Sequence, residues 1–290
     1  MKIAFLGLPL AALALLADGH DVGLALIAVP GAPGTRRLQR RLGQERVLVR
    51  PRLDEHVVKL LDELRPDLLV SWFWTTRIPM ALVSRARLGG IGVHPSLLPR
   101  HRGPDPVSHA ILAGDAETGV TCHRIAAEYG TGAILAQRRH PIPARIDTWR
   151  LGKAPDRPSL ALLREVCALF GAGRPPEERG QDESLATEAP LPEDADLALR
   201  WDAPADEVLR RVRAYAPSPG VFTEIAGQAV TLLEAELVER SSGLLDRPGE
   251  ACFVGGKLLV RARDREVSLL RAEIDGVAVG PEALGRMLSG

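Results

Sequence analysis

Several features that mark common protein classes are scarce or missing in this 290-residue sequence. Its three cysteines, Cys122, Cys167 and Cys252, are odd in number, far apart and form no CxxC pair. Neither a disulfide framework nor a structural zinc site is therefore expected, and we predict a cytoplasmic protein with reduced thiols and no metal. No stretch approaches the roughly 18 to 20 uncharged apolar residues that a membrane span needs, so no membrane partner is expected.

An excess of charge of either sign is missing as well. Basic and acidic residues number 37 each, so the formal net charge is zero. Nothing in that balance requires nucleic acid or a membrane surface as a partner. Apolar residues make up 46% of the chain, which is enough for a real core, and the length fits two domains better than one.

Strand-like and helix-like segments alternate through the first part of the chain. The expected strands are 2–8, 21–29, 46–49, 67–72 and 90–93, and the expected helices are 9–18 and 54–65. Strands that alternate with helices predict an α/β domain over residues 1–170. Its sheet is expected to be doubly wound and mostly parallel, with helices on both faces.

The composition changes after this domain. Residues 171–199 are rich in glycine, proline and acidic residues and poor in apolar ones, which predicts a linker or long exposed loop. Beyond it, an amphipathic helix at 203–215 is followed by several short alternating runs separated by glycine-containing turns. This spacing predicts a smaller C-terminal domain over 200–290, a β-barrel of the OB-like kind.

One segment, from His94 to Leu135, carries the most specific signal. Its distinctive pieces are HPSLLP at 94–99, Arg102-Gly103, GDAETGVT at 114–121 and TGAIL at 131–135. The segment closely resembles the signature of the formyltransferases that use 10-formyltetrahydrofolate. The resemblance continues weakly over nearly the whole chain, and it implies the fold and the formyltransferase-like organisation described above.

His94 directly follows the buried run GIGV and therefore lies at the carboxyl end of a parallel strand, where open α/β sheets place their ligands. The resemblance implies that His94 is the proton-transfer residue. The family also has an asparagine two residues earlier, as oxyanion donor, and an aspartate before the TG pair that keeps the histidine charged. Here these positions are Gly92 and Gly130. Losing one oxyanion donor alone costs on the order of a hundredfold in rate, so catalysis is expected to be weak or lost.

Other residues near the motif have more than one interpretation. His123, on the expected strand VTCHRI, either lines the site or is structural. Asp105 or Glu128 either replaces the lost carboxylate or is a solvated acid or a helix cap. His101 and His109 are expected at the surface.

The folate contacts follow from the resemblance alone. Trp72 and Trp74 occupy the region that lines the pterin pocket in the family, where they either stack on the ligand or fill the cleft. Thr131 and Gly132 belong to the matching TG motif and are expected to contact the folate. The implied cofactor is 10-formyltetrahydrofolate, without a metal.

The resemblance implies transfer of a formyl group to the amine of a small molecule, such as an amino sugar or an amino-acid-derived metabolite. Two alternatives remain: a degenerate homologue kept for binding or as a scaffold, and a pocket converted to a folate-independent reaction. Residues 201–290 carry 11 basic and 14 acidic residues, whereas a domain that holds a tRNA backbone is expected to be basic. Initiator tRNA is therefore not the expected partner, although the four arginines within 36–41 point the other way.

Overall fold

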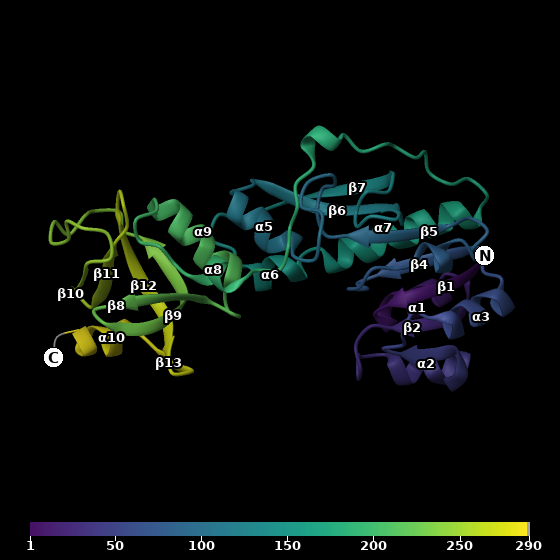
Figure 1. Cartoon of the computed structure of the whole chain (residues 1–290), viewed down its shortest axis with the longest axis horizontal. Coiled ribbons are helices and arrows are strands. Elements are labelled where there is room, and N and C mark those ends of the chain that lie inside the picture. Colours follow the sequence, from purple (N-terminus) through teal and green to yellow (C-terminus); the bar gives the residue numbers. More distant parts are fainter. Residues whose placement is uncertain (289–290) are drawn as a thin grey trace. The chain divides into compact units, whose positions relative to one another are not determined.

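The computed structural model describes residues 1–288, and they form two compact units (Figure 1). The N-terminal unit comprises Met1–Pro106, Thr118–Pro141 and Ala154–Ala189. The C-terminal unit comprises Val107–Glu117, Ile142–Lys153 and the chain from Pro190 onward. The two units thus alternate along the sequence, whereas the expected domain boundaries divide the chain only once. Those boundaries stay a prediction. Within residues 1–288 no helix combines the length and the apolar character that crossing a membrane requires.

A seven-stranded sheet with the order β3-β2-β1-β4-β5-β6-β7 forms the centre of the N-terminal unit. Its strands are β1 (Lys2–Gly7), β2 (Asp21–Ile27), β3 (Val47–Val49), β4 (Leu68–Trp72), β5 (Gly90–His94), β6 (Glu117–Arg124) and β7 (Ile134–Pro141). Strands β1 to β5 pair in parallel, and β6 runs antiparallel to β5. Its helices are α1 (Pro9–Ala17), α2 (Thr35–Leu42), α3 (Glu55–Leu64), α4 (Met80–Val83) and α7 (Asp156–Gly171).

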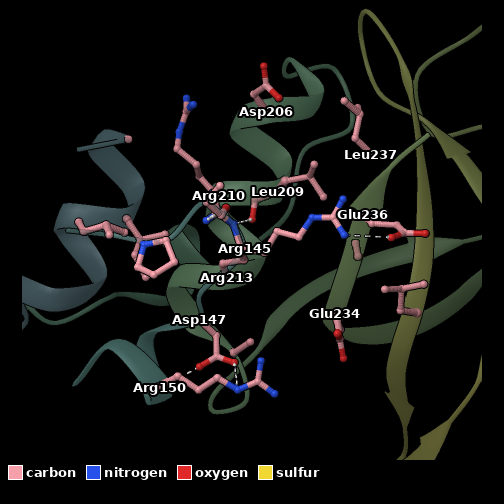
Figure 2. Close-up of a pocket in the computed structure, with 18 of the residues that line it drawn as sticks. Arg145, Asp147, Arg150, Asp206, Leu209, Arg210, Arg213, Glu234, Glu236 and Leu237 are labelled. Carbon is pink, nitrogen blue, oxygen red and sulfur yellow. Dashed lines mark hydrogen bonds and ion pairs between the residues drawn. The ribbon is translucent and has the colours of Figure 1, made fainter. Parts of the chain in front are cut away.

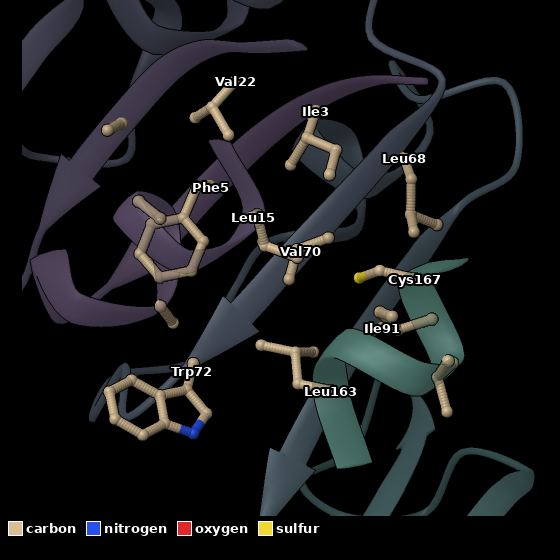
Figure 3. Close-up of a cluster of buried hydrophobic side chains, with 14 of the residues drawn as sticks. Ile3, Phe5, Leu15, Val22, Leu68, Val70, Trp72, Ile91, Leu163 and Cys167 are labelled. Atoms are coloured by element: carbon tan, nitrogen blue, oxygen red, sulfur yellow. The ribbon is translucent and has the colours of Figure 1, made fainter. Parts of the chain in front are cut away.

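Helices cover both faces of this sheet, because alternate side chains of each strand point to opposite sides. On β1, Ile3 and Phe5 pack into the cluster that contains α1 and α7, which Figure 3 shows. Ala4 and Leu6 pack into the cluster that contains α3 and α4. The predicted doubly wound, mostly parallel α/β sheet is confirmed.

The C-terminal unit is built on a six-stranded antiparallel sheet with the order β10-β11-β12-β9-β8, in which β13 pairs with β12. The strands are β8 (Val221–Ile225), β9 (Gln228–Leu237), β10 (Ala251–Val254), β11 (Lys257–Arg261), β12 (Glu266–Ile274) and β13 (Val277–Val279). The helices are α5 (Pro106–Ala113), α6 (Thr148–Lys153), α8 (Asp194–Leu197), α9 (Ala205–Tyr215) and α10 (Pro281–Leu288). Ile111 of α5 and Leu151 of α6 are buried in the same core as Val208 and Val212 of α9. This shared core explains why two early segments belong to the later unit.

The segment expected to be a linker is largely attached to the N-terminal unit. We call residues 178–189 the strap; they include the short 3-10 helix η2 (Glu183–Leu185). Arg179 exchanges two backbone hydrogen bonds with Ile134, of 2.8 and 2.9 Å. The amide of Arg102 donates to the carbonyl of Thr187 at 2.8 Å, and the amide of Ala189 donates back to the carbonyl of Arg102. The polar segment is therefore not a free linker, because backbone groups of the strap form hydrogen bonds with other parts of the chain.

Gly7, at the carboxyl end of β1, allows the tightest approach between neighbouring strands. A Cβ atom at this position would lie 1.8 Å from the carbonyl oxygen of Trp72 on β4. Gly19, which also has a positive φ (84° against 139° for Gly7), would place its Cβ in open space.

Alanine at Gly19 tests backbone strain alone, whereas alanine at Gly7 adds the collision with Trp72. Gly19→Ala is expected to lower the free energy of unfolding by about 1 kcal/mol, because its φ is positive. Gly7→Ala is expected to lose roughly 2 kcal/mol more, because the β1–β4 pairing must also open. Urea unfolding measures both losses, and equal losses would contradict the predicted collision.

Candidate active site

His94 is the last residue of β5, and its side chain is 5% exposed. Its Nε2 lies 2.8 Å from the carbonyl oxygen of His101. A carbonyl oxygen only accepts hydrogen bonds, so Nε2 carries the proton and Nδ1 presents its lone pair. The fold thereby selects one tautomer of His94 and leaves Nδ1 as a proton acceptor.

The carbonyl that fixes His94 is itself held by the strap. His101 has a φ of 57°, and its amide donates to the hydroxyl oxygen of Thr187 at 2.8 Å. The expectation that His101 lies at the surface is wrong: it is 5% exposed, because the strap covers it. The Nε2–H of His109 donates to the carbonyl of Pro190 at 3.0 Å, and His109 is only half-buried.

Burial keeps His94 uncharged. Desolvation lowers the pKa of His94 to about 4, against a smaller opposing effect of the hydrogen bond to His101. The imidazoles of His123 and His101 lower it further, and none of the groups that act on it is a carboxylate. The ion pair that the family resemblance implies, between this histidine and an aspartate, therefore has no counterpart in the electrostatics of His94.

His123 lies on β6 directly opposite Gly92 of β5. Its Nδ1 is 2.7 Å from the carbonyl oxygen of Arg124, so Nδ1 carries the proton and Nε2 presents a lone pair. Burial lowers the pKa of His123, so this ring is also neutral near pH 7. A Cβ at position 92 would lie 3.7 Å from Nε2 of His123, and the rings of His123 and His94 are 6.5 Å apart in an edge-on arrangement. His123 thus lines the space that a side chain at position 92 would enter.

Ser71 of β4, which the sequence did not single out, lies beside Gly92. It pairs with Gly92 in the parallel ladder, and its Cβ lies 3.8 Å from where a Cβ of residue 92 would be. Within the described residues its hydroxyl forms no hydrogen bond, although the residue is 9% exposed. Ser71, Gly92, His123 and His94 therefore share one face of the sheet near the carboxyl ends of β4 and β5, and Ser71 contributes a hydroxyl donor there.

The loop that contains Gly130 and Gly132 is held by a hydrogen-bond network from the strap. The side-chain amide of Gln181 donates to the carbonyls of Gly130 and Gly132, each at 2.7 Å. The oxygen of the same amide accepts from the guanidinium of Arg102 at 2.7 and 3.2 Å. Arg102, whose side chain is 5% exposed, also forms a bidentate ion pair with Glu183 in which both distances are 2.8 Å. Position 130 is therefore packed against Arg102 and sealed by the strap.

Of the two candidate replacements for the lost carboxylate, Glu128 lies at the surface. Glu128 forms an ion pair with Arg77 at 3.4 Å, and both side chains are largely exposed, at 76% and 65%. These contacts favour the interpretation of Glu128 as a solvated acid. The backbone amide of Asp105 donates to the carbonyl of Ala189 at 3.0 Å, which attaches this residue to the end of the strap.

Of the two tryptophans, Trp72 belongs to the core. It is 3% exposed, and its indole N–H donates to the hydroxyl of Ser159 at 3.0 Å (Figure 3). This burial favours the interpretation that Trp72 fills the cleft rather than stacks on a folate. Trp74 packs partly buried against the opposite core cluster. Tyr129, which the sequence did not single out, lies edge-on to His94 with ring centres 6.3 Å apart.

The backbone at the TG motif is held by close packing. A Cβ at Gly132 would lie 1.9 Å from the carbonyl oxygen of Arg124, so only glycine fits there. The hydroxyl of Thr131 donates to the carbonyl of Glu128 at 3.0 Å. A folate contact of either residue stays a prediction.

The stability of the protein is expected to fall in acid because of the buried imidazoles. Since the pKa of His94 drops from 6.5 unfolded to about 4 folded, the unfolded chain binds more protons between these values. The stabilisation is present above pH 6.5 and is lost as the pH falls toward 4. We expect wild type to lose roughly 2 kcal/mol more than His94→Gln between pH 7 and pH 4.5. Urea unfolding at a series of pH values measures this, and parallel curves would contradict a neutral buried His94.

The strap is expected to control the order of the Gly130 loop. Gln181→Ala leaves the carbonyls of Gly130 and Gly132 without their partner, so the amides of 126–135 are expected to exchange with deuterium about tenfold faster. Ser184→Ala is the control, because this strap hydroxyl contacts only Asp182. Unchanged exchange in Gln181→Ala, or equal changes in both variants, would show that Gln181 does not hold the loop.

Comparison with known proteins agrees with this geometry. Residues 36–158 match the formyl transferase family, and residues 193–280 match the formyl transferase C-terminal domain. The methionyl-tRNA formyltransferase of Anaeromyxobacter dehalogenans is 33% identical over 293 residues, covering 95% of this chain and 93% of that protein. The methionyl-tRNA formyltransferase of Treponema denticola is 35% identical over 196 residues, and the match covers 68% of this chain but only 61% of the relative.

Solved structures share the fold at lower identity. An N-formyltransferase from Helicobacter canadensis, in complex with folinic acid and dTDP-3-aminofucose, aligns with a TM-score of 0.71 at 14% identity, over 93% of this chain and 98% of that one. HypX from Aquifex aeolicus, in complex with tetrahydrofolic acid, aligns with a TM-score of 0.66 at 20% identity. That match covers all of this chain, which spans about half of HypX, namely 48%. From the two family matches and the 33% identity to a relative over nearly its full length, the chain belongs to the formyltransferase family.

Proposed function

We propose that this protein binds 10-formyltetrahydrofolate and transfers its formyl group, slowly, to the amine of a small molecule such as an amino sugar or an amino-acid-derived metabolite. The observation that carries the proposal is the free Nδ1 of His94, fixed by the His101 carbonyl at the carboxyl end of β5. Family membership supports folate-dependent formyl transfer. The structural neighbours that bind tetrahydrofolic acid or folinic acid support the same choice of cofactor.

The residues fit a formyl folate in part. The TG backbone is kept in place by the tight packing of Gly132 and by Gln181, and Thr131 and Gly132 are proposed to contact the folate. The burial of Trp72 disfavours stacking on the ligand. Around position 92, neutral His94 and His123 present lone pairs and Ser71 presents a hydroxyl, so Ser71 would be the donor to the formyl oxygen. The fit therefore depends on Ser71 as hydrogen-bond donor.

When bound, 10-formyltetrahydrofolate would supply the formyl group. As the amine bonds to the formyl carbon, the bond from that carbon to N10 of the folate would break and tetrahydrofolate would leave. The amine would lose a proton, which Nδ1 of His94 is placed to accept and to pass to the departing nitrogen. With a pKa of about 4, His94 is a weak base at neutral pH, which limits the contribution of proton transfer. Ser71 in place of the family asparagine would stabilise the charge that develops on the formyl oxygen.

The two glycine positions differ in how they accept the family residues. A Cβ at Gly92 makes only ordinary contacts, at 3.7 to 3.8 Å, so Gly92→Asn fits beside Ser71 and His123. Gly130 has a φ of 71°, and a Cβ there would lie 3.1 Å from Cγ of Arg102. Gly130→Asp is therefore strained and displaces the strap network, so the pair of changes is not expected to exceed Gly92→Asn alone.

Two specific observations favour other functions. The 5% exposure of His94 and the two imidazole acceptors favour a binding protein without turnover. The relatives named methionyl-tRNA formyltransferase favour methionyl-tRNA as the acceptor, against the excess of acidic residues in 201–290. Each is an outcome of the experiment below.

The decisive assay follows hydrolysis of a formyl folate, which needs no knowledge of the acceptor. Wild type is expected to act measurably above background, and both His94→Gln and Ser71→Ala are expected to lower the rate at least about tenfold. Gly92→Asn is expected to raise the rate about tenfold or more and to restore activity in the Ser71→Ala background, because both side chains serve one oxygen. Failure of Gly92→Asn to rescue Ser71→Ala would overturn the role of Ser71.

Folate binding is measured in parallel by the shift in melting temperature with a stable formyl-folate analogue. Binding together with background rates in every variant identifies the binding protein without turnover. Absence of any shift at millimolar analogue contradicts the proposed function as a whole. With activity in hand, adding amino sugars or methionyl-tRNA as acceptor identifies the substrate by accelerated loss of the formyl folate.

A further inference from the structure

A cavity of about 570 Å³ lies entirely within the C-terminal unit (Figure 2). Its wall is formed by α9, by β9 and β12, and by the segments 111–116 and 142–150. This volume is typical of a site for a small molecule. Five arginines line it: Arg145, Arg150, Arg210, Arg213 and Arg271.

Most carboxylates of the wall are already neutralised by a basic residue, as the dashed lines in Figure 2 illustrate for two of them. The pairs are Asp147 with Arg150 at 3.6 Å, Glu236 with Arg145 at 3.8 Å and with Lys257 at 3.7 Å, and Asp206 with Arg265 at 2.7 Å. Glu234 lies opposite Arg271 in the β9–β12 ladder. Asp115 is a fifth acidic residue of the wall. Arg210 and Arg213 take part in none of these ion pairs.

Arg210 and Arg213, one turn apart on α9, are held by backbone carbonyls alone. Nε of Arg210 donates to the carbonyl of Leu112 at 3.2 Å. Arg213 donates through Nε to the carbonyl of Leu209 at 3.3 Å and through Nη1 to the carbonyl of Ala144. Within residues 1–288 neither forms an ion pair. Carbonyls orient the two guanidinium groups without neutralising them, and both Nη groups of Arg210 and Nη2 of Arg213 remain available as donors.

The two charges are close enough to repel each other. Burial lowers the pKa of Arg213 and the charge of Arg210 lowers it further, against an opposing effect of Asp206. Like charges at this spacing on a helix are destabilising, and an anion between them would reverse the effect. The two arginines therefore favour an anionic ligand in the cavity.

We propose that this cavity binds the phosphate group of a small phosphorylated metabolite, with Arg210 and Arg213 as its clamp. A phosphate dianion matches two guanidinium groups in charge and in hydrogen-bonding geometry. Leu209 and Leu237 provide apolar contact for the organic part of the ligand. A cavity of this size holds a small ligand rather than an extended nucleic-acid backbone. The inference does not depend on folate binding by the N-terminal unit.

Calorimetry on the full chain tests the clamp with inorganic pyrophosphate and uridine diphosphate as probes, at matched ionic strength. Saturable binding to wild type is expected, weakened about tenfold or more in Arg210→Gln/Arg213→Gln. The control Arg240→Gln/Arg286→Gln removes two positive charges from the same unit outside the cavity wall and is expected to change affinity less than about twofold. Melting temperatures without ligand check folding, and Arg210→Gln alone serves if the double variant does not fold, because that side chain makes a single hydrogen bond.

Three outcomes would overturn the proposal. One is the absence of saturable binding by either probe to wild type at millimolar concentration. Another is equal weakening by the clamp and control variants, which indicates general electrostatic attraction. The third is binding of a short RNA that the clamp variants abolish while neither small probe binds. A folate-induced melting shift that persists in the clamp variants keeps this test separate from that of the proposed function.

Discussion

The buried guanidinium of Arg102 holds together the three chain segments that form the His94 site. It joins the loop after β5, to which it belongs, with Gln181 and Glu183 of the strap, and Gln181 in turn binds the carbonyls of Gly130 and Gly132. The backbone of Arg102 exchanges hydrogen bonds with the strap as well. The Arg102 side chain is 5% exposed whereas Glu183 is 68% exposed, so the cost of losing these contacts falls on the buried guanidinium, which would be left without acceptors. The geometry around His94 therefore depends on contacts that the strap makes with Arg102.

A chain of hydrogen bonds from Thr187 through His101 determines the tautomer of His94. Thr187 fixes His101, the carbonyl of His101 fixes the Nε2 proton of His94, and burial keeps the ring neutral. A charged histidine beside an aspartate, which the family resemblance implies, is replaced by a neutral histidine beside a carbonyl. A neutral histidine can accept a proton but stabilises an oxyanion only weakly. In the proposed function Ser71 therefore supplies the hydrogen bond to the oxyanion.

The sequence predicted the fold and the place of His94 at the end of a strand because both follow from local patterns. The alternation of apolar runs and helices predicted the doubly wound sheet, and the position of His94 after GIGV predicted its place at a strand end. The sequence could not predict contacts between distant segments. Gln181 and Thr187 lie in a polar segment whose partners are some 50 to 90 residues earlier, so composition indicated an exposed linker. Trp72 was ambiguous for the same reason, because its partner Ser159 is 87 residues away.

The most direct test of the account is the protonation state of His94 itself. Nitrogen-15 NMR of histidine-labelled protein, with His94→Gln to assign the signal, reports the proton on each ring nitrogen. The account predicts a neutral His94 with the proton on Nε2 from pH 8 down to at least about pH 5. A cationic His94 at pH 7, or a neutral ring with its proton on Nδ1, would contradict it.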